Sequence, residues 1–232
     1  MRFLFLLCFL LSFNLFSQDN LVASEYFKNG DFEKAVLSYK KLLDKTPNNN
    51  TYLLQLVKSY QQLEQLDQAE KVLQNRIKKM NYPPLLVELG YNYQLKNNLV
   101  EANKYYSNAI NFIDKNPNYA IVIGRGFESK SLLEQAITVY TKAMDLKPEL
   151  NYNLQLAKIY GEQGHVEKMF HSYLNLVEVN NSYLNPTKRA FNDFISENSD
   201  NENNLILKRI LLKKIQQEPN LLWNQMLSWL FV

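Results

Sequence analysis

The chain has 232 residues, of which 46% are hydrophobic, and this content excludes bulk disorder. Its net charge of +3 comes from 26 basic and 23 acidic residues that are interspersed along the chain. A concentrated basic face of the kind that binds nucleic acid is therefore not predicted. Six glycines and seven prolines are few for this length, so the composition favours helices over a sheet-rich fold.

The first seventeen residues have the order of a secretory signal. Met1 and Arg2 give a positive start, residues 3–16 are apolar at nearly every position, and Ser17 supplies a small residue before polar sequence begins. The apolar stretch is shorter than the ~20 residues that span a bilayer. We expect residues 1–17 to be a cleaved signal and the protein to be exported, to the periplasm or cell envelope. An uncleaved anchor is the alternative.

No catalytic, cofactor or metal site is predicted. The single cysteine, Cys8, lies in the signal, so the mature chain would have no thiol. His165 and His171 are six residues apart and do not share a helical face. The segment 124–126, Gly-Arg-Gly, lacks the preceding strand and the following Lys-Ser or Lys-Thr of a phosphate loop. We therefore predict a protein that is not an enzyme and takes no cofactor and no metal.

Internal similarity recurs with a period of 33 or 34 residues. One position of the period holds, in successive copies, Ala35, Ala69, Ala102, Ala136 and Met169. Nine residues before each of these lies an aromatic residue: Tyr26, Tyr60, Tyr93, Phe127 and Tyr160. Several positions recurring in phase over five copies indicate a repeat architecture.

The pattern resembles the tetratricopeptide repeat family, of the exported bacterial type, whose unit is a helix–turn–helix of ~34 residues. Residues 89–93, Leu-Gly-x-x-Tyr, reproduce the core motif of that family, and the resemblance covers residues 19 to about 182. It implies an all-α fold, a right-handed superhelical solenoid of antiparallel helix pairs. Two residues of the second repeat depart from the family pattern, because Val57 and Arg76 stand where small residues are expected.

The spacing of apolar residues favours the same fold. An amphipathic helical stripe at i, i+3, i+4 and i+7 is formed by Leu53, Leu56, Val57 and Tyr60. Small residues such as Gly90 and Ala102 would let paired helices approach closely. Gly30 and Gly164 fall between predicted helices, where a turn needs backbone freedom. Since one unit cannot bury its own stripe, neighbouring units must stack.

The expected organisation has four parts. They are a signal at 1–17, five repeats at 18–182, a degenerate sixth repeat at 183–218 and the first helix of an incomplete seventh at 219–232. The sixth repeat should hold helices at 186–195 and 205–217, separated by a polar loop at 196–204.

The last predicted helix carries apolar side chains that nothing after them in the sequence would cover: Leu222, Trp223, Met226, Trp229, Leu230 and Phe231. End repeats of solenoids normally present a polar outer face. This helix is therefore expected to be either the cut end of a longer protein or a docking surface. Membrane association through residues 221–232 is a further alternative, although none is expected for the mature chain as a whole.

The resemblance implies a peptide-binding groove on the concave face, lined by the first helices of the repeats. Carried over to this chain, one row of the groove is apolar and consists of Leu54, Val87, Ile121 and Leu154. The row one turn later consists of Lys58, Tyr91, Arg125 and Lys158. Such a face would suit an extended or helical peptide with apolar anchors and acidic character. The alternative is that the apolar row packs between helices and the cations only aid solubility.

These observations predict a non-catalytic scaffold of the cell envelope that binds another protein or a peptide. The alternative is a structural spacer that forms the N-terminal part of a longer protein, whose function lies beyond residue 232. The sequence does not give the oligomeric state or the identity of the partner.

Overall fold

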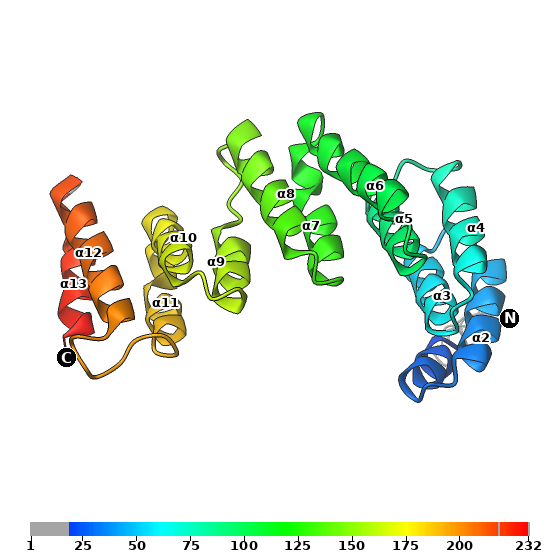
Figure 1. The fold of residues 1–232 in the computed structure, drawn as a ribbon, viewed down its shortest axis with the longest axis horizontal. Helices are drawn as coiled ribbons and strands as arrows, with labels where there is room; N and C mark the ends of the chain where they lie inside the picture. The colour runs from blue at the N-terminus through cyan, green and yellow to red at the C-terminus, as the bar shows by residue number, and fades with distance from the viewer. Residues whose placement is uncertain (1–18, 218, 232) are drawn as a thin grey trace, which may run out of the picture. The chain divides into compact units, whose positions relative to one another are not determined.

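The computed structural model describes residues 19–217 and 219–231, so the predicted signal at 1–17 lies outside the described residues. Within them the chain is built from helices and contains no strand (Figure 1). Residues 19–28 are helical, and the α-helices that follow are α2 (Phe32–Lys45), α3 (Asn50–Gln62), α4 (Leu66–Ile77), α5 (Pro84–Leu95), α6 (Leu99–Asn111), α7 (Ala120–Glu128), α8 (Leu133–Leu146), α9 (Asn153–Glu162), α10 (Val166–Val179), α11 (Leu184–Phe191), α12 (Glu202–Gln217) and α13 (Leu221–Leu230). Short 3-10 helices lie at η1 (Phe112–Asp114), η2 (Pro117–Tyr119) and η3 (Asn181–Tyr183).

Consecutive helices pack as antiparallel pairs, which confirms the predicted all-α solenoid architecture within each part of the chain. The structure divides into two compact units, with the division between Ala109 and Ile110 near the end of α6. We describe the two units separately. The subdivision into five repeats and a degenerate sixth stays a prediction.

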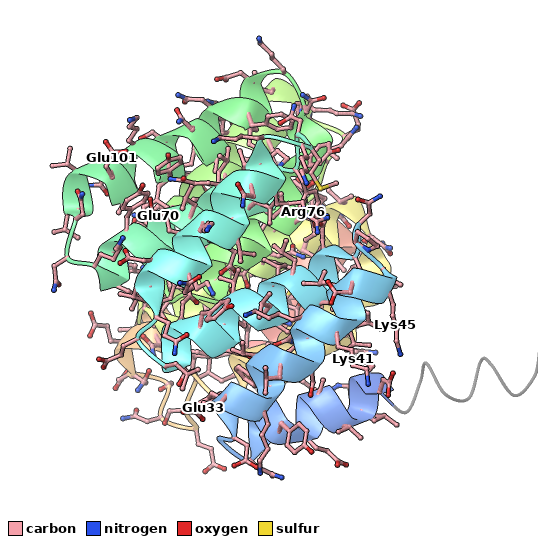
Figure 2. All side chains as sticks on the ribbon, turned by 90° about the vertical axis from the view of Figure 1, so that its right-hand side faces the viewer. Glu33, Lys41, Lys45, Glu70, Arg76 and Glu101 are labelled. Atoms are coloured by element: carbon pink, nitrogen blue, oxygen red, sulfur yellow. The ribbon has the colours of Figure 1, made fainter. Side chains whose placement is uncertain are left out.

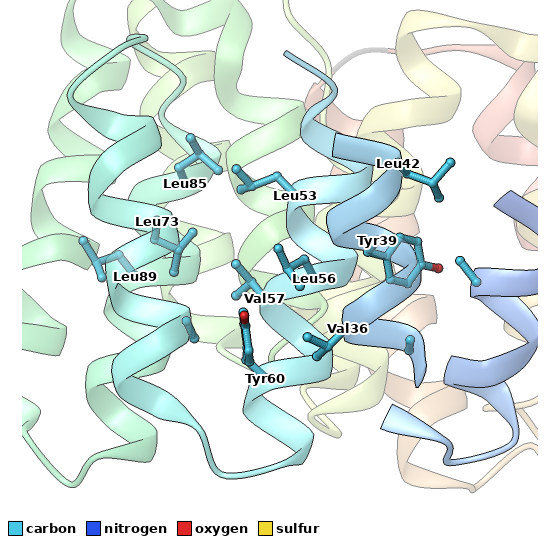
Figure 3. Packing of buried hydrophobic residues seen from close by; sticks show 13 residues of the cluster. Val36, Tyr39, Leu42, Leu53, Leu56, Val57, Tyr60, Leu73, Leu85 and Leu89 are labelled. Atoms are coloured by element: carbon cyan, nitrogen blue, oxygen red, sulfur yellow. The ribbon is translucent and has the colours of Figure 1, made fainter. Parts of the chain in front are cut away.

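The core of unit 1 is formed by the apolar stripes of successive helices (Figure 3). Tyr39 and Leu42 of α2 face Leu53 and Leu56 of α3, and all four side chains are buried. The stripe of α3 predicted from spacing is thus confirmed. Asn49 caps α3, since its side chain accepts a hydrogen bond of 3.1 Å from the Tyr52 backbone N–H.

Every turn between the two helices of a predicted repeat contains one residue with a positive φ. Gly30 (+80°) and Gly164 (+74°) take this conformation in the first and fifth copies, which confirms the prediction for both glycines. The equivalent residues of the other copies are Glu64 (56°), Asn97 (59°) and Ser131 (56°). The left-handed conformation therefore follows the repeat, although three of the five residues carry a side chain.

Close helix approach depends on glycine in two pairs. A Cβ at Gly90 on α5 would lie 2.5 Å from Cε1 of Tyr106 on α6, and Gly124 on α7 is covered in the same way by Tyr140 on α8. In the second copy the pair is Val57 and Leu73, and both side chains are 0% exposed. A larger residue on one helix is thus matched by a smaller partner on the other.

A core cluster of unit 2 extends from α9 to α13. Phe170 of α10 and Phe191 of α11 are fully buried, with ring centroids 4.6 Å apart in an edge-to-face contact. In the predicted loop at 196–204 the helix α12 begins early, at Glu202. Asn204 accounts for this difference, because its side chain donates to the backbone oxygens of Ser196 (2.6 Å) and Asn198 (3.1 Å) and thereby fixes the loop to α12.

Candidate functional site: the first-helix face

We use the name first-helix face for the side of the first helices that carries the predicted groove residues, and we describe it in each unit by itself. In unit 1 it is carried by α3 and α5, and in unit 2 by α7 and α9. Four of the eight predicted groove residues fall in each unit.

In unit 1 the predicted positions differ in accessibility. Leu54 and Lys58 lie one turn apart on α3 and are both half-buried, as is Tyr91 on α5. Val87, in contrast, is 0% exposed. The prediction that Val87 lines an exposed groove is therefore wrong, because its side chain is enclosed by the packed helices and a ligand cannot reach it.

In unit 2 all four positions are accessible. Ile121 and Leu154 are half-buried, and the cations one turn later, Arg125 on α7 and Lys158 on α9, are exposed. Each helix thus presents an apolar side chain and a cation on the same face, since residues i and i+4 are neighbours on a helix.

Polar side chains hold the first helices of unit 1 in register. Asn92 of α5 is 0% exposed and donates to the backbone oxygen of Leu66 at 2.9 Å. Its own side-chain oxygen accepts from Gln61 of α3 at 3.4 Å. A buried amide whose hydrogen bonds are made fixes the spacing of α3 and α5, because leaving it without a partner would be costly.

In unit 2 the start of α9 is held by aromatic packing. Tyr152, just before α9, packs on Tyr140 of α8 with the ring centroids 5.1 Å apart. At the other end Gln163 donates to Glu134 of α8 at 2.8 Å. These contacts position the α9 side chains Leu154 and Lys158.

The cations of the first-helix face differ from many cations elsewhere in the chain. Lys96 bridges Asp67 and Glu70 at 2.6 Å each, and Lys142 pairs with Asp114 at 2.8 Å. In the part of the chain that the structure describes, Lys58, Arg125 and Lys158 form no ion pair. Their charges are left to solvent or to a ligand.

The predicted C-terminal docking surface is wrong in its first half. Leu222, Trp223 and Met226 of α13 are 6%, 1% and 0% exposed, because α13 folds back on α12 and closes the core of unit 2. Nζ of Lys214 also lies over the Trp223 ring, 4.8 Å from its centroid.

The end of α13 is more open. Trp229 and Leu230 are half-buried, and Phe231 is 54% exposed. Nζ of Lys188 lies 5.6 Å from the ring centroid of Trp229, and Nζ of Lys208 lies 5.4 Å from that of Phe231. A small surface patch remains where the sequence predicted an uncovered helix.

The polar cluster around Glu70 is structural. Glu70 of α4 accepts from Tyr93 (2.8 Å), Gln74 (2.8 Å) and Lys96 (2.6 Å), and so joins α4 to α5. Partial burial raises the pKa of Glu70, but the hydrogen bonds from Lys96 and Tyr93 outweigh it and hold the pKa below its ordinary value. Burial, with the bond to Glu70, raises the pKa of Tyr93 to about 12.

Metal ligation and membrane crossing find no support in the described residues. No group of three or more His, Cys, Asp or Glu side chains among them is placed to hold a metal ion. Nor does any helix in this part of the chain have the length and apolarity needed to cross a membrane.

Arg76 is a further candidate functional residue that was not predicted from the sequence. Arg76 departs from the repeat pattern in the sequence, and in the structure it lines a groove between α2 and α4. The sequence did hold an indication of this role, because a large cation stands at a packing position where the repeat pattern expects a small residue.

A family described as the TT21 fifth ARM repeats domain matches residues 18–119. No curated protein matched the chain. Among solved structures, MamA is 18% identical with a TM-score of 0.38, covering 78% of this chain and 96% of its own. The TPR protein TTC0263 of Thermus thermophilus is 16% identical with a TM-score of 0.42, covering 77% and 97%. YrrB, titled a TPR protein with an unusual peptide-binding site, is 14% identical with a TM-score of 0.33, covering 70% and 84%.

The helix pairs described above, with their recurring turns and glycine contacts, define the class of protein: it is an all-α repeat protein with TPR-like units.

Proposed function

We propose that the protein is a non-catalytic scaffold that binds another protein or a peptide on its first-helix face. The observation that carries the proposal is a set of exposed cations, without an ion pair among the described residues, beside half-buried apolar side chains on α7 and α9. The set consists of Ile121, Arg125, Leu154 and Lys158. A partner segment would pack its apolar side chains against Ile121 and Leu154, and its carboxylates would pair with Arg125 and Lys158.

The architecture supports the same function. Within each unit, stacked helix pairs present a surface of side chains whose positions are fixed by buried packing residues, and such surfaces bind extended or helical segments. Binding needs no bond making, so the protein is proposed to act without a cofactor or metal.

We also propose that the scaffold works outside the cytoplasm, in the periplasm or cell envelope. The support is the order of residues 1–17, a positive start followed by an apolar stretch and a small residue. Mass spectrometry of the protein purified from its native cells tests this. A mature chain that begins at Gln18 and is found in the envelope fraction is expected, and an intact N-terminus in the cytosolic fraction would refute it.

A structural spacer is the second candidate, and it makes a different prediction for the same face. A spacer needs its helix packing only, so changes to the exposed cations would have no effect on its role.

Site-specific cross-linking tests the scaffold. A photo-reactive amino acid is placed at Arg125 or Lys158 of the full chain, and at Lys71 or Lys213, which are exposed on other helices, as matched controls. A partner cross-linked from the two first-helix positions and absent from the controls is expected. Equal cross-linking from all four positions, or from none, would favour the spacer.

A further inference from the structure

Arg76 is a buried cation at a position where the repeat pattern expects a small residue. It lies in the last turn of α4 and is 9% exposed. Its guanidinium donates to the backbone oxygen of Pro47, to Oδ1 of Asn50 at 3.4 Å and toward Sδ of Met80 at 4.0 Å. All three acceptors are neutral.

None of these three acceptors neutralises the charge of Arg76. Among residues 19–217 and 219–231, no carboxylate forms an ion pair with it. Buried charges are ordinarily paired, because removing an ion from water costs several kcal/mol. The guanidinium has five N–H donors in a planar fork that suits a carboxylate, and neutral acceptors leave part of that capacity unused.

Arg76 lines a groove of unit 1 that we call the α2–α4 groove. Its walls come from α2 and α4, and its floor comes from buried leucines of α3. The half-buried apolar residues that line it are Leu43, Val72 and Met80. The charged residues that line it are Lys40, Asp44, Arg76 and Lys79, so cations exceed acids by three to one.

The groove lies near the C-terminal ends of α2 and α4, whose last turns carry Lys45 and Arg76. Figure 2 shows Glu33, Glu70 and Glu101 toward one end of α2, α4 and α6, and Lys41, Lys45 and Arg76 toward the other end. The helix dipole favours this separation and accounts for exposed cations at helix C-termini. It does not account for a guanidinium that is nine-tenths buried beside an apolar floor.

We propose that the α2–α4 groove binds an acidic peptide segment of a partner protein, with an apolar side chain over Val72 and Met80 and a carboxylate facing Arg76. Lys40 and Lys79, at the rim, attract the remaining acidic residues of the segment. The occupant is acidic because the groove has a net positive charge, and it has an apolar anchor because the floor is apolar.

This site goes beyond the first-helix face. It uses Leu53 and Leu56 of α3, which lie on a different side of that helix from Leu54 and Lys58. None of the residues of the proposed function takes part in it, so either proposal can fail while the other stands.

The test measures the binding of a fluorescent peptide to the full chain by polarisation. The probe is a short synthetic peptide of Glu and Leu, arranged so that the leucines lie on one side and the glutamates on the other. A second peptide carries Gln in place of every Glu. The test variant is Lys40→Glu with Lys79→Glu. The matched control is Lys28→Glu with Lys71→Glu, which makes the same change of charge at exposed positions of unit 1 outside the groove.

The acidic peptide is expected to bind at least about tenfold more weakly to the test variant than to the wild type, and within about twofold as tightly to the control. The Gln peptide should bind at least about tenfold more weakly than the Glu peptide. Arg76→Met should weaken the binding of the Glu peptide to the same extent, and circular dichroism should show that the helices are retained.

Three results would overturn the proposal. The first is no saturable binding of the Glu peptide, or binding that both double variants change equally. The second is an Arg76→Met variant that lowers the melting temperature and leaves peptide affinity unchanged, because Arg76 would then only fasten the α2–α3 turn. The third is a wild-type chain that sediments as a dimer while the test variant is a monomer, which would assign the groove to a second copy.

Discussion

At the scale of single residues, the backbone of the turns carries strain that the sequence does not reveal. Glu64, Asn97 and Ser131 adopt positive φ values at the positions that Gly30 and Gly164 occupy in other repeats. A residue with a Cβ in this conformation costs roughly 1–2 kcal/mol, whereas glycine adopts it freely.

Glu64→Gly is therefore expected to stabilise unit 1, by about 0.5–1 kcal/mol after the greater chain entropy of glycine is subtracted. Gly30→Ala should destabilise the same unit by about 1 kcal/mol, because alanine carries the Cβ that this conformation disfavours. Urea unfolding followed by circular dichroism measures both. A Glu64→Gly variant less stable than the wild type would show that the side chain, not the turn, determines stability there.

The contact between Gly90 and Tyr106 makes a second prediction at this scale. Gly90→Ala places a Cβ 2.5 Å from the Tyr106 ring, and the overpacking should cost about 1–3 kcal/mol. Adding Tyr106→Leu should recover part of that loss, as the native pair of Val57 and Leu73 suggests, although it also removes the 2.9 Å hydrogen bond from Tyr106 to Gln94. A double-mutant cycle of unfolding free energies measures the coupling, and additive effects would contradict this account.

At the scale of the helices, the carboxylate of Glu70 links α4 to α5. Because its pKa in the folded protein is below the ordinary value of 4.5, its contribution is fully present above that pH and is lost as the pH falls through the folded value. Glu70→Gln should thus lower stability by roughly 1 kcal/mol at neutral pH. Melting temperatures of the two proteins should converge as the pH is lowered below 4.5 and through the folded-state pKa. A constant difference would exclude the ionised form as the cause.

The last helix, α13, is part of the core of unit 2, whereas its sequence suggested an uncovered apolar face. Trp223→Ala should destabilise unit 2 by about 3–5 kcal/mol, because the side chain is 1% exposed in the core. Phe231→Ala, at a side chain 54% exposed, should change stability by less than about 0.5 kcal/mol. Hydrogen exchange across α10 to α13 distinguishes the two variants, and equal protection in both would mean that α13 is not part of the core.

At the scale of the whole molecule, the repeat period was sufficient to predict the helix pairs and their turns. Periodicity fixes which side of a helix faces its partner, so the stripe of α3 and the contact at Gly90 followed from spacing. It does not fix what covers an apolar side chain. The burial of Trp223 and of Val87 depends on how neighbouring helices stack, and the same residues in the sequence fit a docking surface or a groove equally well.

Arg76 shows the same limit for polar residues. Its departure from the repeat pattern was visible in the sequence, but its hydrogen bonds to Pro47 and Asn50 and its place in a groove depend on the turn between α2 and α3. The sequence therefore predicted the cationic positions of the first-helix face but not the groove on another side of α3.

The measurement that tests the central claim most directly is affinity purification of the tagged full chain from its native cells, in two charge-matched variants. One carries Lys58→Ala, Arg125→Ala and Lys158→Ala on the first-helix face. The other carries Lys71→Ala, Lys115→Ala and Lys213→Ala at exposed positions elsewhere. Both must first show the helical circular dichroism of the wild type. A partner that the wild type and the second variant retain, and the first variant loses, is predicted. A partner retained by both variants, or lost equally by both, would contradict a scaffold that binds through its first-helix face.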